Sequence, residues 1–138
     1  MIQTPQAKAA LARYQSDSIL SATPGQLVTM LYGRLVLDLR RAEAAQLEQD
    51  WVHASSELVH AQAIVAELSS ALRPDVWEGG TQLLGIYTYA TRLLVDANVK
   101  RDIEPTREAL ALLEPLKIAW DEAAATLAGA PAAADHVA

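Results

Sequence analysis

The sequence predicts an all-α protein: an antiparallel, up-down-up-down four-helix bundle preceded by a short N-terminal arm or helix. Three observations support this fold class. The 138 residues include 27 Ala and 20 Leu but only 9 Val and 6 Ile, and Ala and Leu favour helices whereas β-branched residues favour strands. Apolar residues recur every three or four positions in four successive segments, as on one face of a helix. Connections of a few residues favour antiparallel neighbours.

We expect residues 1–22 to form the arm, 23–128 the bundle and 129–138 a flexible C-terminal tail. The alanine-rich stretch 6–14 can form a short helix. The serine-rich stretch 16–21 favours turns, because serine and aspartate side chains compete for main-chain hydrogen bonds.

The first long helix has a clear start signal. Thr23 can cap the first turn, Pro24 suits the first helical position, and Gln26 completes a capping box. The apolar residues on one face of this helix are Val28, Leu31, Leu35, Leu39 and Ala42.

The second helix carries the most regular pattern in the sequence, a heptad seam of the kind that bundle helices bury. Arg73 and Pro74 end it, because the residue before a proline is pushed away from helical geometry. The seam consists of Trp51, Ala54, Leu58, Ala61, Val65, Leu68 and Leu72.

The third helix is expected to start with a capping box of Asp75 and Glu78 and to end at Asn98, a residue that tolerates left-handed backbone. Because its apolar pattern runs through residues 79–80, we expect both glycines inside the helix. The seam consists of Val76, Gly80, Leu83, Tyr87, Ala90, Leu94 and Ala97.

The fourth helix is expected to start at Asp102. Pro105 falls in its first turn, where proline is tolerated, whereas Pro115 lies in its interior and should kink it. Its buried face is expected to contain Thr106, Leu110, Leu113, Lys117, Trp120, Ala124 and Leu127.

Some of these helices are more apolar than a bundle requires. The third has no charged residue from 79 to 91, and Ile86, Tyr89 and Leu93 form a second apolar stripe. Two interpretations are open: this helix is central and covered by the arm through Tyr14 and Ile19, or its outward apolar surface is a site for a partner.

Composition argues against several other functions. The net charge of −6 repels phosphate backbones, so a nucleic-acid partner is not expected. The chain has no Cys, no signal-peptide layout and no apolar run of the ~18 residues that a membrane span needs. We therefore expect a cytoplasmic protein without membrane insertion.

The histidines do not predict catalysis or metal binding. His53 and His60 are two helical turns apart, too far to share one metal ion, and the sequence shows no catalytic constellation, so no enzyme activity, metal or cofactor is expected. The alternative function is a histidine phosphotransfer bundle that uses His60. The Lys-Gly pair that typically follows the histidine of such domains is absent after His60.

Three blocks resemble the flagellar export chaperone family FliS, over about residues 14 to 122. The first runs from Tyr14 through Ile19 and Ala22-Thr23-Pro24 to Met30-Leu31-Tyr32, the second from Tyr87-Thr88-Tyr89 to Ala97-Asn98, and the third from Leu112 to Trp120. One departure is that Gly33 precedes Arg34, whereas the family usually has a polar residue and then Gly.

The resemblance implies a cytosolic chaperone that binds the disordered C-terminal segment of newly made flagellin. Such a chaperone prevents premature polymerisation and aids export through the flagellar type III apparatus, and an export-gate component is a second candidate partner. The predicted flagellin contacts are Tyr14, Ile19, Leu27, Met30, Leu31, Tyr87, Leu94, Ala97 and Asn98. Of these, Leu31, Tyr87, Leu94 and Ala97 also lie on predicted core seams, and the arm either covers the groove or clamps the partner.

Overall fold

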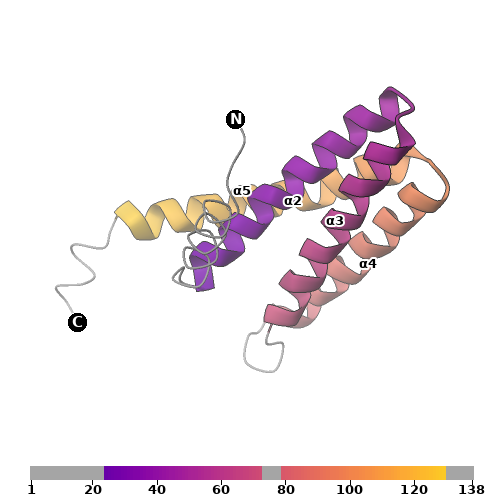
Figure 1. Cartoon of the computed structure of the whole chain (residues 1–138). Coiled ribbons are helices and arrows are strands. Elements are labelled where there is room, and N and C mark those ends of the chain that lie inside the picture. The colour runs from indigo at the N-terminus through magenta and orange to yellow at the C-terminus, as the bar shows by residue number, and fades with distance from the viewer. Residues whose placement is uncertain (1–23, 73–78, 130–138) are drawn as a thin grey trace, which may run out of the picture.

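The computed structural model describes residues 24–72 and 79–129, which form four helices (Figure 1). They are α2 (Pro24–Leu47), α3 (Trp51–Ala71), α4 (Gly80–Val99) and α5 (Ile103–Gly129). Each helix packs against two neighbours, because α2 and α4 both contact α3 and α5. The predicted all-α four-helix bundle is confirmed.

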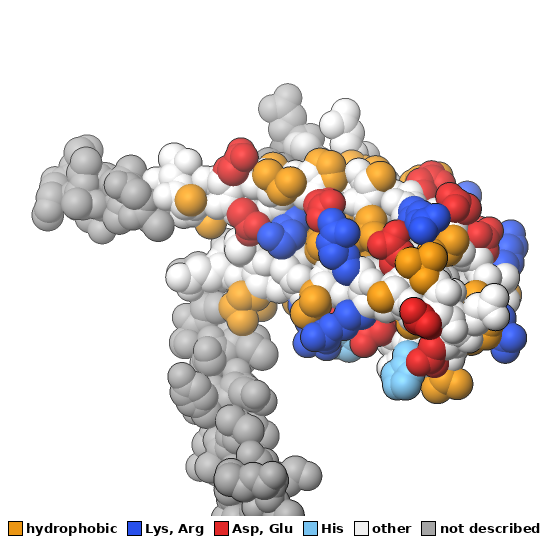
Figure 2. Space-filling model, turned by 90° about the horizontal axis from the view of Figure 1, so that it is seen from above, with side chains coloured by type: hydrophobic (Ala, Val, Ile, Leu, Met, Phe, Trp, Pro, Cys, Tyr) orange, Lys and Arg blue, Asp and Glu red, His pale blue; other side chains and the backbone are white. Residues whose placement is uncertain are grey.

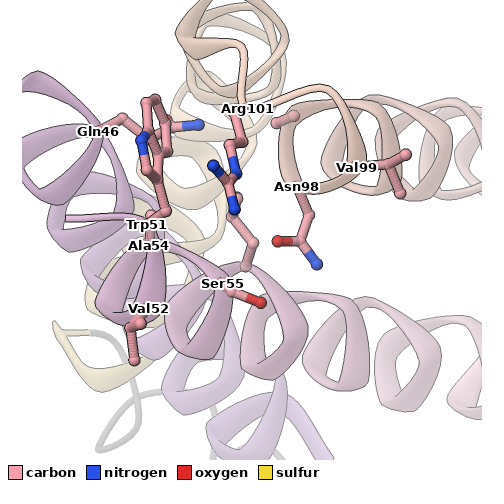
Figure 3. A pocket seen from close by; sticks show the side chains of 10 residues that line it. Gln46, Trp51, Val52, Ala54, Ser55, Asn98, Val99 and Arg101 are labelled. Atoms are coloured by element: carbon pink, nitrogen blue, oxygen red, sulfur yellow. The ribbon is translucent and has the colours of Figure 1, made fainter. Parts of the chain in front are cut away.

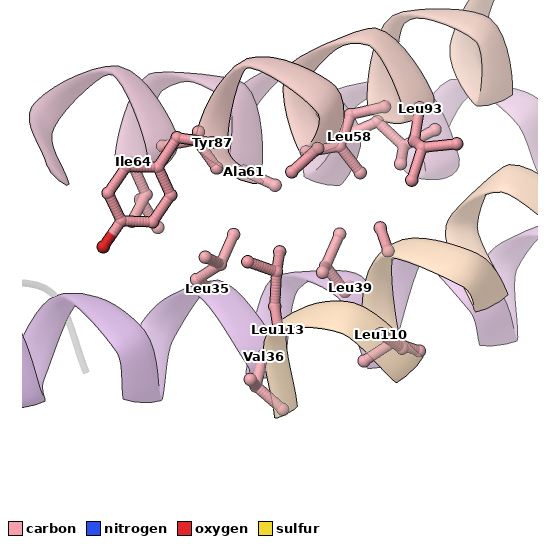
Figure 4. Packing of buried hydrophobic residues seen from close by; sticks show 14 of the residues in the cluster. Leu35, Val36, Leu39, Leu58, Ala61, Ile64, Tyr87, Leu93, Leu110 and Leu113 are labelled. Atoms are coloured by element: carbon pink, nitrogen blue, oxygen red, sulfur yellow. The ribbon is translucent and has the colours of Figure 1, made fainter. Parts of the chain in front are cut away.

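The core contains the central positions of all four predicted seams. Leu35 of α2, Leu58 of α3, Leu94 of α4 and Leu113 of α5 have no more than 1% of their surface exposed. Figure 4 shows side chains from different helices pointing toward one another in this cluster. Burial of these large apolar side chains is the main term that stabilises the bundle.

The two connections α2–α3 and α4–α5 lie at the same end of the bundle, which we call the closed end (residues 47–51 and 99–103). With distance from this end, α2 and α5 diverge from α3 and α4 (Figure 1). The C-terminal part of α5 therefore extends away from the α3–α4 pair.

Each of the two helices that end at the closed end is followed by a non-glycine residue with positive φ. After α2 this is Gln49 (φ 58°), and after α4 it is Arg101 (φ 51°). The amide of the next residue reaches back five positions: Asp50 N donates to Ala45 O at 2.8 Å, and Asp102 N to Ala97 O at 3.1 Å. This is the Schellman arrangement, which usually has glycine at the left-handed position.

Two predicted helix boundaries were wrong. Asn98 does not end α4, since the helix runs to Val99 and Arg101 takes the left-handed position. Gly79 and Gly80 do not lie in the interior of α4, because Gly79 is its N-cap and Gly80 its first residue. Glycine disfavours helix interiors, and a helix end avoids that destabilisation.

Other boundaries agree with the prediction or lie outside the described residues. Asp102 directly precedes α5, and its carboxylate accepts a hydrogen bond from Glu104 N at 3.0 Å. Helix α5 continues through Pro115 as one element. The predicted arm, the tail beyond 129 and the capping box of Asp75 and Glu78 are outside the described residues, so they stay predictions.

Charged side chains join α2 to α5 across the surface. Arg40 of α2 pairs with Glu114 of α5, and Arg107 of α5 pairs with Glu43 of α2 at 3.0 Å. Acidic and basic side chains are intermingled over the face of the bundle that Figure 2 shows. None of the four described helices is long and apolar enough to cross a membrane.

Candidate partner-binding surface on α3 and α4

A buried carboxylate shows which flank of α3 faces α2. The side chain of Asp38 in α2 is fully buried, accepts a hydrogen bond from Arg34 Nε at 2.9 Å, and pairs with Nδ1 of His60 in α3. His60, the residue of the phosphotransfer alternative, therefore has a structural partner that joins two helices.

A second pair shows which flank of α4 faces α5. The hydroxyl of Tyr89 donates a hydrogen bond to the Glu108 carboxylate of α5, and this bond is the main reason why the pKa of Tyr89 is raised. His60 lies on the side of α3 that faces α2, and Tyr89 lies on the side of α4 that faces α5. Because α3 and α4 contact each other, the flank of α3 opposite His60 adjoins the flank of α4 opposite Tyr89.

These adjoining flanks carry no charged residue. Several of their apolar side chains are exposed, among them Val52 (80%) and Val59 of α3, and Leu84, Val95 and Val99 (75%) of α4. We call this surface the α3–α4 strip. Its members are Val52, Ser55, Val59, Gln62 and Ala66 of α3, with Leu84, Thr88, Thr91, Val95 and Val99 of α4.

The strip ends in a hollow at the closed end of the bundle, with a volume of about 480 Å³ (Figure 3). Trp51, Val52 and Ser55 line it from α3, and Asn98 and Val99 from α4. Gln46 of α2 and Arg101 of the α4–α5 connection complete the lining. The hollow therefore combines apolar walls with polar groups that come from three helices and from the α4–α5 connection.

A further hollow, of about 450 Å³, lies on the outward face of α4. Leu84 and Thr88 line it and also belong to the strip, and Tyr89 and Arg92 lie on its other side. This hollow therefore adjoins the strip along α4 and mixes apolar with polar and charged side chains. Leu93, predicted in the second apolar stripe, is instead buried in the core.

The structure separates the predicted contact residues into groups. Tyr14 and Ile19 lie outside the described residues. In the first turns of α2, Met30 is exposed and Leu27 and Leu31 are half-buried. The core contains Tyr87, Leu94 and Ala97. Asn98 is half-buried and lines the hollow at the closed end, as does Ala97.

Sequence reasoning missed the exposed residues of the α3–α4 strip and the cation beside it. Val52, Val59 and Ala66 recur at intervals of seven beside the core seam of α3, a signal that was present but was hidden by the stronger seam. Arg101 gave no signal, because its relation to Trp51 depends on how two connections meet.

The fold defines a four-helix-bundle protein with an exposed apolar strip on α3 and α4. Residues 6–127 match the model of the family described as flagellar protein FliS, and the chain belongs to this family. It is a family of chaperones and not of enzymes.

Three similar proteins bear the name flagellar secretion chaperone FliS. The one from Bacillus subtilis is 33% identical over 110 residues, which cover 80% of this chain and 82% of the relative. The Escherichia coli protein is 30% identical over 108 residues (77% and 79%). The Salmonella typhimurium protein is 31% identical over 109 residues (77% and 80%).

Proposed function

We propose that this protein is a cytoplasmic chaperone that binds the disordered C-terminal segment of newly made flagellin. It thereby prevents premature polymerisation and aids export through the flagellar type III apparatus. Membership of a secretion-chaperone family supports the general role. The observation that carries the binding mode is the uncharged strip with exposed Val52, Val59, Val95 and Val99, since amphipathic helices bind apolar surfaces of this kind.

The size of the strip limits how much of the partner it can bind. From Val52 to Ala66 it spans about 21 Å along α3, at 1.5 Å per residue, which is about four turns of a bound helix. Ordering a disordered segment costs about 2–5 kcal/mol or more. The strip alone is therefore a small interface, and we expect the bound segment to contact further surfaces.

The exposed side chain of Met30 and half-buried Leu27 and Leu31 offer such a second surface on α2. In the structure, Tyr87, Leu94 and Ala97 are enclosed by neighbouring helices. A partner would contact Tyr87 and Leu94 only after those helices separate, whereas Ala97 also lines the hollow at the closed end. We propose that Tyr14 and Ile19 cover the apolar surface on α2 before flagellin binds. An export-gate component is a second proposed partner.

The experiment uses charge substitutions on the strip. We expect Val59→Asp and Val95→Asp each to weaken binding of the recombinant flagellin C-terminal segment more than tenfold, because each places a carboxylate within the apolar contact. Ala44→Asp is the matched control, since Ala44 is exposed on α2 away from the strip. Isothermal titration calorimetry measures affinity, and circular dichroism checks folding.

Full-length flagellin should bind the wild-type chaperone, and flagellin without its C-terminal segment should not. If both forms bind equally well, the proposed partner segment is wrong. If both strip variants bind like the wild type, the α3–α4 strip is not the contact surface.

A further inference from the structure

Two cations at the closed end have no acidic partner within the described residues. Lys100 and Arg101 are both exposed and are absent from the ion pairs that engage Arg34, Arg40, Arg107 and Lys117. Asp102, the adjacent acid in sequence, uses its carboxylate to accept a hydrogen bond from Glu104 N. A protein with a net charge of −6 thus presents a local pair of positive charges beside the hollow.

The backbone holds Arg101 in an unusual conformation. Its φ of 51° is left-handed, a conformation that is strained for a residue with a Cβ. The connection is held by the Asp102 N to Ala97 O bond and by Gln46 Nε2, which donates to Asp102 O at 3.1 Å. Glycine would occupy this position without strain. Gln49 has the same backbone conformation after α2, so glycine at either position tests the side chain without disturbing the turn.

The guanidinium lies over the indole of Trp51, 5.8 Å from the ring centroid. Figure 3 shows both side chains at the hollow, with Asn98 and Ser55 nearby. Stacking on an aromatic face leaves the N–H groups at the edge of the guanidinium available to bind a carboxylate. Trp51 therefore orients Arg101 without neutralising its charge.

The hollow has further unused hydrogen-bonding capacity. Gln46 is only 4% exposed, and its Oε1 has no hydrogen-bond partner within the described residues. The amide orientation follows from its surroundings, because Nε2 must face the carbonyl oxygen of Asp102 to donate to it. Oε1 only accepts hydrogen bonds and cannot bind a carboxylate, so of these two groups it is the unpaired cation Arg101 that can bind an anion at the end of the apolar strip.

We propose that Arg101, assisted by Lys100, binds the carboxylate of an aspartate or glutamate side chain in the segment that occupies the α3–α4 strip. This inference rests on the proposed function and specifies how the segment is oriented. Apolar contacts along the strip are non-directional and permit either direction and several registers. A single ion pair at the closed end selects one of them, because charge complementarity sets register more than it sets affinity.

The test compares two glycine substitutions that act alike on the backbone. Gln49→Gly and Arg101→Gly both relieve a left-handed residue at the end of a helix, so neither should unfold the protein. We expect Arg101→Gly to bind the recombinant flagellin C-terminal segment about two- to fivefold more weakly at low salt, the range of exposed ion pairs. The difference should disappear at high salt. Gln49→Gly should bind like the wild type.

Two additional experiments identify the cause of the weaker binding of Arg101→Gly. Arg41→Gln removes an exposed arginine from α2 and controls for net charge; it should leave affinity unchanged. In the flagellin segment, Asp and Glu residues are replaced one at a time by Asn or Gln. One of these replacements should weaken binding to the wild-type chaperone but not to Arg101→Gly, which identifies the partner carboxylate.

Equal low-salt affinity of Arg101→Gly and the wild type would overturn the inference and would leave Arg101 as a cover for Trp51. An effect reproduced entirely by amidating the C-terminus of the segment would also overturn it, in favour of the terminal carboxylate. Loss of binding in Val59→Asp together with unchanged binding in Arg101→Gly would refute this inference alone. Failure of the wild type to bind the segment would refute the proposed function as well.

Discussion

The hydroxyl oxygens of Tyr32 and Tyr87 lie 2.6 Å apart in the core and share a hydrogen bond. The two residues belong to α2 and α4, which lie opposite each other among the four helices. Trp120 of α5 packs against Tyr32, with ring centroids 6.4 Å apart. The bond allows two polar groups to be buried together, because each hydroxyl satisfies the other.

The first prediction is that these hydroxyls are energetically coupled. Tyr32→Phe and Tyr87→Phe should each lower the free energy of unfolding by about 1–3 kcal/mol, because each removes the hydrogen bond between the two buried hydroxyls. The double variant should lose less than the sum of the two single losses. Urea unfolding of the four proteins measures this coupling, and strictly additive losses would contradict it.

The second prediction concerns alkaline pH. Burial raises the pKa of Tyr32 above its ordinary value of 10.0, although hydrogen bonds with Tyr87 and Trp120 oppose this shift. Burial and the bond to Tyr32 raise the pKa of Tyr87. Below the unfolded-state pKa both states are protonated, and the stability from these groups is fully present. Above it the unfolded state loses its protons first, so stability falls as pH rises.

We therefore expect the free energy of unfolding to fall from about pH 9 to about pH 11. The fall should be less steep in the double variant Tyr32→Phe/Tyr87→Phe. Lysines also titrate in this range, so the comparison between wild type and double variant is the informative quantity. Parallel pH profiles for the two proteins would show that the buried tyrosines do not contribute.

The third prediction separates the two histidines of α3. His60→Ala leaves the fully buried carboxylate of Asp38 with Arg34 as its remaining partner, and should cost about 1–3 kcal/mol. His53→Ala is the matched control, because His53 is largely exposed and pairs with the half-buried Asp50; it should cost less than about 1 kcal/mol. Equal losses in urea unfolding would argue against a structural role for His60.

The fourth prediction concerns Pro115, which is exposed in the interior of α5. Pro115→Ala restores a main-chain donor and should raise the free energy of unfolding by about 1–3 kcal/mol, somewhat less than the full penalty of an interior proline because proline also restricts the unfolded chain. Pro105→Ala, in the first turn of the same helix, should have little effect. Thermal unfolding measures the stability of both variants against the wild type. An unchanged or lower stability of Pro115→Ala would refute the prediction.

The sequence alone determined the four helices and most of the core. Helical periodicity is a local property, so residues such as Leu35, Leu58 and Leu113 could be assigned to buried faces from their spacing. The family resemblance, carried by short ordered blocks, was equally readable and is confirmed by the match over residues 6–127.

Only the tertiary structure decided how the flanks of those helices are used. Spacing does not show whether Val59 faces a neighbour or solvent, or that His60 meets Asp38, because both depend on which helix lies on which side. The sequence also predicted Asn98 as the left-handed residue that ends α4, whereas in the structure Arg101 has the left-handed backbone. The hollow exists because two connections distant in sequence, one before Trp51 and one at Arg101, meet at the same end of the bundle.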